Sequence, residues 1–169
     1  MTRLDVASLL LRVALGVCIF LHGANKWRSP ESRRGTAGWF ASIGMRRSKV
    51  QAVMAAFTEM GAGVLLVGGL FVPTAGAAAL ATMVVAIVVA HRRRGFFIFN
   101  EGQGGEYCAL LGVVALAISG MGGGRVSIDN ALGIDYGGTW GFATGLFLGI
   151  GGAALHLVVS YRPGPKAAR

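Results

Sequence analysis

The stretch VASLLLRVALGVCIFLHGANK, residues 6–26, decides the class of fold. A helix needs about 20 apolar residues to cross the roughly 30 Å hydrocarbon layer of a membrane, and this run is long enough. No small-x-small cleavage site closes the run, so we expect it to stay in the protein as a membrane span and not to be removed as a signal peptide. Further apolar segments follow at about 51–72, 75–91, 106–121 and 139–161.

The composition of the whole chain agrees with a membrane protein. Of the 169 residues, 54% are hydrophobic and 14% are charged, and the mean hydropathy is +0.62. A soluble domain of this size carries about a quarter charged residues. The same composition excludes intrinsic disorder, a collagen repeat and a disulfide-stapled secreted scaffold. We therefore expect an all-α integral membrane protein that contacts the lipid bilayer.

The basic residues predict how the chain is oriented. The net charge is +9, which on a membrane protein encodes orientation, and we expect no nucleic-acid partner. With five spans, 13 of the 16 Lys and Arg residues fall on one side, in the first loop, the third loop and the tail. The positive-inside rule then places the N-terminus outside and the C-terminus in the cytoplasm of a bacterial cell.

Several ionisable residues lie within the spans or at their ends. A charge in mid-bilayer costs at least about 2.5 to 3.5 kcal/mol, so each one needs a partner or a wet cavity. At 1.5 Å per residue, Glu59 lies about 12 Å and Arg12 about 20 Å from the cytoplasmic boundary, with four others within roughly one turn of it. Those four are His22, Lys26, His91 and Glu106. We expect these side chains to share a polar pocket in the inner half of the bilayer.

Each candidate also has a purely structural interpretation. Arg12 and Glu59 could form an ion pair that fixes helix register. Lys26 could extend its ammonium to the lipid headgroups. His22 and His91 could be ordinary interfacial histidines, and we expect His156, in the last span, to be packed or interfacial and not a ligand. The functional interpretation is a pocket that handles protons or binds a headgroup, since histidine titrates near neutrality.

Metal and thiol chemistry have little support in the sequence. Haem and di-iron sites in helix bundles use motifs such as Glu-x-x-His, and none occurs here. A site built from His22, His91, Glu59 and Glu106 is a weaker alternative, and we expect no metal. The cysteines, Cys18 and Cys108, do not form a Cys-x-x-Cys motif, which argues against dithiol redox chemistry.

Two further segments suggest packing and interfacial structure. Small residues recur at every fourth position of the last span, a pattern that lets another helix approach closely: Gly141, Gly145, Gly149 and Ala153. This stripe could pack within the bundle or on a partner, and we favour a partner protein or a homo-oligomer. The segment 36–46 suits either a short interfacial helix or an ordered loop, and residues 96–99 suit an interfacial or re-entrant segment.

Separated motifs occur in a recognisable order: LLLRVALGVCIFLHGANKW at 9–27, FTEMGAGVLLVGGLFVPTAGAAALATMVVAIVVAH at 57–91, GGEYCALL at 104–111 and GGGRVSID at 122–129. They resemble the DoxX family of small bacterial membrane proteins. The resemblance implies a four-helix membrane domain over residues 1–125, with residues 126–169 adding an outer loop, a fifth helix and a basic tail. It also marks the family's polar positions, here Arg12, His22, Gly23, Lys26, Glu59, His91, Gly105, Glu106 and Tyr107.

The family takes its name from an association with a quinone-linked membrane oxidoreductase. The resemblance therefore implies a membrane subunit or anchor of an oxidoreductase or redox-stress assembly, with a quinone as a possible ligand and no other cofactor expected. A carrier of small hydrophobic molecules with proton-handling Glu and His residues is the alternative. A third hypothesis is an enzyme acting on quinol or sulfur substrates, with Glu59 and Glu106 as acid and base.

Overall fold

The computed structural model describes residues 1–163, and Lys166 and Arg169 of the predicted basic tail lie outside them. The helices, in chain order, are α1 (Arg3–Trp27), α2 (Pro30–Ser42), α3 (Ser48–Gly68), α4 (Val72–Ala86), the π-helix η1 (Ile87–His91), α5 (Glu106–Met121), α6 (Ile128–Ala131) and α7 (Gly138–Ser160).

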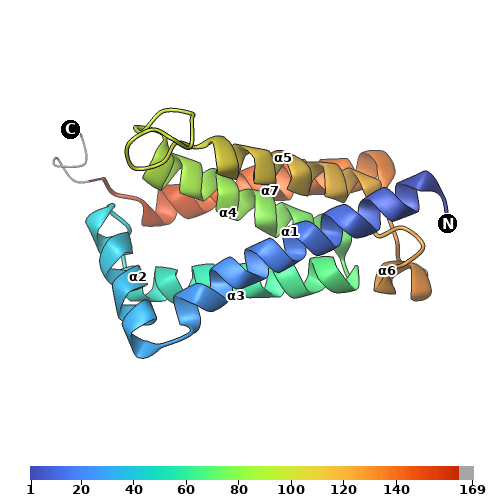
Figure 1. Cartoon of the computed structure of the whole chain (residues 1–169), viewed down its shortest axis with the longest axis horizontal. Helices are drawn as coiled ribbons and strands as arrows, with labels where there is room; N and C mark the ends of the chain where they lie inside the picture. The colour runs from blue at the N-terminus through green and yellow to red at the C-terminus, as the bar shows by residue number, and fades with distance from the viewer. Residues whose placement is uncertain (164–169) are drawn as a thin grey trace.

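The long helices lie side by side along the long axis of the molecule (Figure 1). By length and composition, α1, α3, α4 with η1, and α7 are each able to cross a membrane, and the apolar α5 is shorter at 16 residues. The protein is therefore an all-α, multi-pass membrane bundle. Helix α2 lies across one end of the bundle, and the short α6 lies at the other end (Figure 1).

Local sequence signals explain where several helices begin. Thr2 and Asp5 form a capping box at the start of α1, in which each side chain accepts a hydrogen bond from the backbone of the other. Ser29 caps α2 and Pro30 occupies its first turn, so residues 36–42 belong to a helix that starts earlier than the sequence suggested, and residues 43–46 form the turn after it. Residues 96–99 lie in the loop between η1 and α5.

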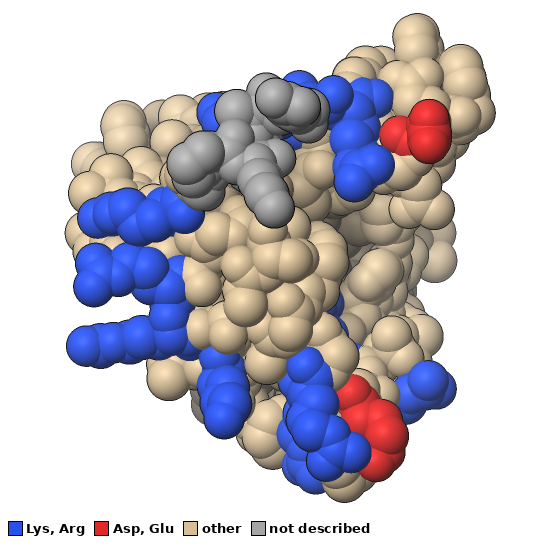
Figure 2. Space-filling model, turned by 90° about the vertical axis from the view of Figure 1, so that its left-hand side faces the viewer, with Lys and Arg blue, Asp and Glu red and all other residues tan. Residues whose placement is uncertain are grey.

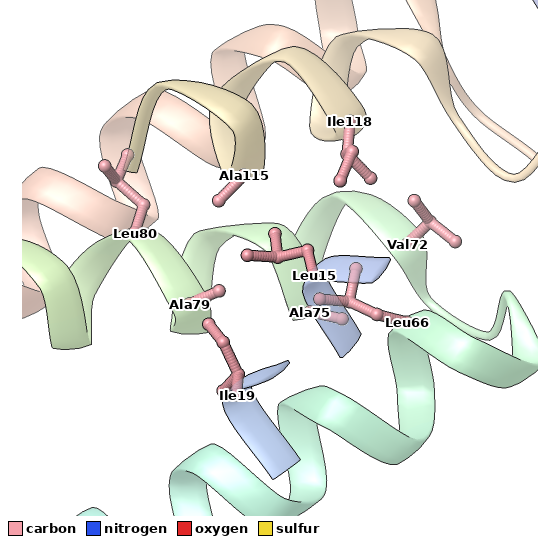
Figure 3. Packing of buried hydrophobic residues seen from close by; sticks show 9 residues of the cluster. All are labelled: Leu15, Ile19, Leu66, Val72, Ala75, Ala79, Leu80, Ala115 and Ile118. Atoms are coloured by element: carbon pink, nitrogen blue, oxygen red, sulfur yellow. The ribbon is translucent and has the colours of Figure 1, made fainter. Parts of the chain in front are cut away.

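The apolar core lies where α1, α3, α4 and α5 meet (Figure 3). Leu15 and Ile19 of α1, Leu66 of α3 and Ile118 of α5 are almost completely buried there. Alanines of α4 and α5 fill the spaces between these larger side chains and bring the helices close together. The core therefore occupies the middle of the bundle and leaves its two ends for polar contacts.

The small-residue stripe of α7 packs inside the same chain. Its four members are buried, and α7 contacts α4 and α5 along its length. A Cβ atom on Gly145 would lie 2.5 Å from Cβ of Ser119, and one on Gly149 would lie 2.7 Å from Leu80. Of the two alternatives for the stripe, packing within the bundle is the one found, because α4 and α5 cover it; a partner protein or homo-oligomer on another face of α7 stays a prediction. The other face of α7 exposes large apolar side chains such as Trp140 and Phe147, as a lipid-facing surface does.

The C-terminal end of α7 is tied to the turn between α2 and α3. Arg46 N donates to Ser160 O at 2.8 Å, and Arg162 N donates to Gly44 O at 2.8 Å. Gly44 has φ of +90°, and a Cβ atom there would lie 2.5 Å from the carbonyl oxygen of Arg162, so the contact requires glycine. These bonds join the α1–α3 half of the bundle to the α4–α5–α7 half.

We call this end, formed by α2, the loop at residues 92–105 and the last turn of α7, the basic end. Lys and Arg side chains surround a broad uncharged area on this face, with few acidic side chains among them (Figure 2). The sequence places most basic residues on one side of the membrane, and in the folded protein many of them lie on this one face (Figure 2).

Candidate functional site

A chamber of about 440 Å³ lies at the basic end, between the α1–α3 half and the α4–α5–α7 half of the bundle. Helix α2 and the 92–105 loop contribute to its wall beside the five long helices. Most of the lining is apolar. Five of the seven polar residues predicted from the sequence line it: His22, Lys26, Glu59, His91 and Tyr107.

An ion pair between Lys26 of α1 and Glu59 of α3 forms part of the chamber wall. The Nζ atom of Lys26 donates to Oε2 of Glu59 at 2.6 Å, and the two side chains are 19% and 10% exposed. Lys26 therefore does not extend into solvent at the headgroup level. The proposed ion pair between Arg12 and Glu59 is wrong, since Glu59 has Lys26 as its cation.

Glu59 faces α1 because small residues allow the two helices to touch. Gly63, one turn after Glu59, packs against Gly16 and Phe20 of α1, and Gly23 packs against the backbone of Ala56. Close approach of the two backbones directs both charged side chains toward each other at the edge of the helix contact.

A second polar group links α1 and α5 on the other side of the chamber. The hydroxyl of Tyr107 lies 2.8 Å from Cys18 Sγ and 3.5 Å from His22 Nε2. Cys18 and His22 are one helical turn apart, so they face the same neighbour. Tyr107 is 39% exposed and His22 is exposed as well, so these two chamber-lining side chains are accessible from the surface of the bundle.

His91 reaches the chamber from the π-helix η1. Arg92 N donates to Ile87 O at 2.7 Å, an i→i−5 bond that inserts one extra residue into the helical turn. His91 Nδ1 lies 2.8 Å from Gln103 O, which connects the ring to the 92–105 loop. The π-helix places Val89 and His91 together in the wall of the chamber.

His156 of α7 also lines the chamber, although the sequence analysis did not propose it as a ligand. It follows Ala153, the last member of the buried stripe, by three residues, and so continues the inward face of α7. That spacing is the signal that could have identified it. Trp39 and Phe40 of α2 close the chamber at the basic end.

Arg12 lies outside the chamber, which corrects its assignment to the shared pocket. The side chain is fully buried, and its guanidinium donates to the carbonyl oxygens of Leu66 at 2.9 Å and Val126 at 2.6 Å. Leu66 O also accepts a hydrogen bond from Gly69 N at 3.2 Å, so Arg12 adds a second donor at the C-terminal end of α3. Counting depth along the helix axis missed this role because Arg12 points toward the α6 end.

Glu106 also lies outside the chamber, and its placement there was wrong. Its Oε2 atom accepts a hydrogen bond from Ile98 N at 3.1 Å, and the backbone N–H of Glu106 donates to Phe96 O at 2.7 Å. Glu106 therefore holds the 92–105 loop against the start of α5. No acid–base step in the chamber can be assigned to it.

Within residues 1–163, no group of three or more His, Cys, Asp and Glu side chains is arranged to hold a metal ion. The polar groups of the chamber are hydrogen-bond donors and acceptors set in an apolar wall. Such an arrangement suits an amphipathic organic molecule whose polar end accepts hydrogen bonds.

The fold and the chamber define a small multi-pass membrane protein. Its pocket lies at one end and is largely apolar, with a few polar side chains in the wall. The model of the DoxX family matches residues 7–92, about half of the chain. The chain is also 32% identical over 116 residues to a protein of Bacillus subtilis (strain 168) named "Putative oxidoreductase CatD", an alignment that covers 69% of this chain and 81% of that protein. The chain belongs to the DoxX family. No solved structure matches it.

Proposed function

We propose that the protein is a membrane subunit that supports an oxidoreductase, and that its chamber binds a quinone-like molecule. The observation that carries the proposal is the group of hydrogen-bonding side chains from α1, η1 and α5 in an otherwise apolar chamber. The name of the Bacillus subtilis relative, which calls that protein an oxidoreductase, agrees with the proposal.

The chemistry of a quinone fits this wall. Its ring carbonyls accept hydrogen bonds, which Tyr107, His22 and Lys26 are able to donate. Its ring and isoprenoid tail are apolar, like the remaining surface of the chamber. The exposure of Tyr107 and His22 would let such a molecule enter between α1 and α5. The volume of about 440 Å³ lies in the range of small-molecule sites.

We further propose that the basic end faces the cytoplasm of a bacterial inner membrane, following the positive-inside rule. A soluble redox partner would then dock on the basic face shown in Figure 2. The broad uncharged area within the ring of cations would contact the partner without charge repulsion, and the cations would favour an acidic partner.

The fluorescence of Trp39 provides a direct test, because this residue lines the chamber. In a Trp27→Phe, Trp140→Phe background, a short-chain naphthoquinone should quench Trp39 with a saturable dependence on concentration. Tyr107→Phe should weaken the apparent affinity about tenfold, the effect of one lost hydrogen bond of roughly 1.4 kcal/mol.

Tyr136→Phe is the matched control, since Tyr136 is 38% exposed, like Tyr107 at 39%, but lies outside the chamber lining. Its affinity should equal that of the parent protein. Equal affinity of both variants, or quenching that does not saturate, would refute binding of a quinone in the chamber.

A carrier with proton-handling residues is the second candidate, and the Lys26–Glu59 pair inside the chamber favours it. Proteoliposomes separate the two hypotheses. A carrier would move a labelled hydrophobic amine across the membrane in response to a pH gradient, and Glu59→Gln would abolish the response. A subunit that only binds a quinone would show no movement above that of protein-free liposomes.

A further inference from the structure

A second cavity, of about 470 Å³, lies outside the chamber between the end of α1, helix α2 and the start of α3. Four cationic side chains from all three helices line it: Lys26, Arg33, Arg34 and Lys49. The rest of its wall is formed by small and apolar residues, with Trp27 as the largest of them. We call this cavity the α2 pocket.

Acidic side chains neutralise only part of the charge of the α2 pocket. Among residues 1–163 there are two salt bridges, Lys26 with Glu59 and Arg34 with Glu31. Arg33 and Lys49 have no acidic partner in this part of the chain. Arg33 lies over the ring of Trp27 at 4.8 Å from its centroid, which fixes the guanidinium at the pocket wall. The pocket therefore has an excess of positive charge.

The N-terminus of α3 lies at the same wall, since Ser48 and Lys49 line the pocket. The residue before the helix, Arg47, has φ of 51°, and no side chain caps the helix. Val50 N and Gln51 N both donate to Arg47 O, and the first N–H groups of an α-helix have no partner within the helix. Free N–H groups and the helix dipole favour an anion at this position.

The apolar side of the α2 pocket continues onto the face of α3. Val53 lines the pocket and is 41% exposed, and Phe57, one turn further on, is 52% exposed. Phe57 packs edge-on against Trp27 at 4.9 Å between ring centroids. A molecule with an anionic head and a hydrocarbon chain would thus find cations at one end of this surface and apolar side chains along the rest.

We propose that the α2 pocket binds the headgroup of an anionic phospholipid, with its phosphate among Arg33, Lys49 and the N-terminus of α3, and an acyl chain along Val53 and Phe57. The position agrees with this ligand, since the pocket lies where α1 ends and α3 begins, at the level of the membrane surface. Basic pockets between membrane helices bind lipid headgroups in this way.

Lipid binding to the full-length protein in mixed micelles tests the proposal. Native mass spectrometry should count a tightly bound phosphatidylglycerol that phosphatidylcholine does not displace. The double variant Arg33→Gln, Lys49→Gln should lower the apparent affinity for phosphatidylglycerol at least about tenfold. Each basic residue near an anionic lipid contributes about fivefold to the affinity, and the variant removes two of them. Circular dichroism checks that the variant is folded.

The matched control is Arg92→Gln, Arg93→Gln, which removes the same charge from an exposed loop at the same end. Its lipid affinity should change less than about twofold. Equal weakening by the two double variants would mean that only the general charge of the basic end acts, and would overturn the proposal. Displacement of the lipid by millimolar inorganic phosphate, or equal binding of phosphatidylcholine, would overturn it as well.

Discussion

At the scale of single residues, one cation contributes to each end of the bundle: Arg12 is fully buried and Lys26 is half-buried, and the two have different types of acceptor. Arg12 donates to backbone carbonyls of α3 and of the loop before α6. Lys26 donates to the carboxylate of Glu59. Both side chains are withdrawn from solvent, so the cost of removing either depends on which acceptors it leaves behind.

Replacing Arg12 with leucine should destabilise the protein strongly. The change leaves the carbonyl oxygens of Leu66 and Val126 without this donor in a buried site, which costs about 2 to 3 kcal/mol. Thermal unfolding in detergent measures the loss. Arg125→Gln, at an exposed position of the neighbouring loop, should unfold at nearly the parent temperature. An unchanged unfolding temperature for Arg12→Leu would show that these bonds do not stabilise the fold.

The Lys26–Glu59 pair calls for a double-mutant cycle. Lys26→Met leaves a carboxylate in the chamber wall without its cation, and Glu59→Gln leaves an ammonium without its anion. The double variant removes both charges, so it should be more stable than the sum of the two single changes predicts, by about 1 to 3 kcal/mol. Additive effects in chemical unfolding would mean that the pair contributes no coupling energy.

The sequence predicted the spans and five of the polar residues that line the chamber, because hydropathy and the cost of a buried charge are both visible along the chain. It did not predict which charges meet. Arg12 and Lys26 both lie on α1, and depth alone favoured Arg12 as the partner of Glu59. The direction in which a side chain points, and which carbonyl oxygens of a neighbouring helix it reaches, depend on packing between helices. His156 was missed because its position next to the buried stripe was not used.

At the scale of elements, α7 and the π-helix η1 give the chamber its shape. Helix α7 packs closely on α4 and α5 because its contact face has almost no side chains. The extra residue in η1 turns the end of the third span toward the chamber. Hydropathy alone does not distinguish a closely packed helix such as α7, or a π-helix such as η1, from an ordinary membrane span.

Two alanine substitutions on α7 separate helix packing from helix propensity. Gly145→Ala would bring a Cβ atom to 2.5 Å from Ser119, whereas Gly151→Ala meets no atom within 4 Å. Overpacking should make Gly145→Ala less stable by about 1 to 3 kcal/mol. Gly151→Ala should leave stability unchanged or slightly raise it. Thermal unfolding compares the two, and equal values would argue against the close contact with α5.

At the scale of the whole molecule, the two ends of the bundle differ in charge, and this difference should set its orientation in the membrane. In a background without Cys18 and Cys108, a membrane-impermeant maleimide added to intact spheroplasts should label Arg125→Cys and leave Arg93→Cys unlabelled. After permeabilisation both should react. Labelling of Arg93→Cys in intact spheroplasts would reverse the proposed orientation.

Of the residues that line the chamber and the α2 pocket, Lys26 is the one common to both. The ammonium group of Lys26 thus lies between the two compartments. It cannot form a close ion pair with an anion in each of them at the same time. We expect an anion in one compartment to draw this cation away from the other. Occupancy of one compartment should therefore weaken the binding of an anion in its neighbour through this one shared side chain.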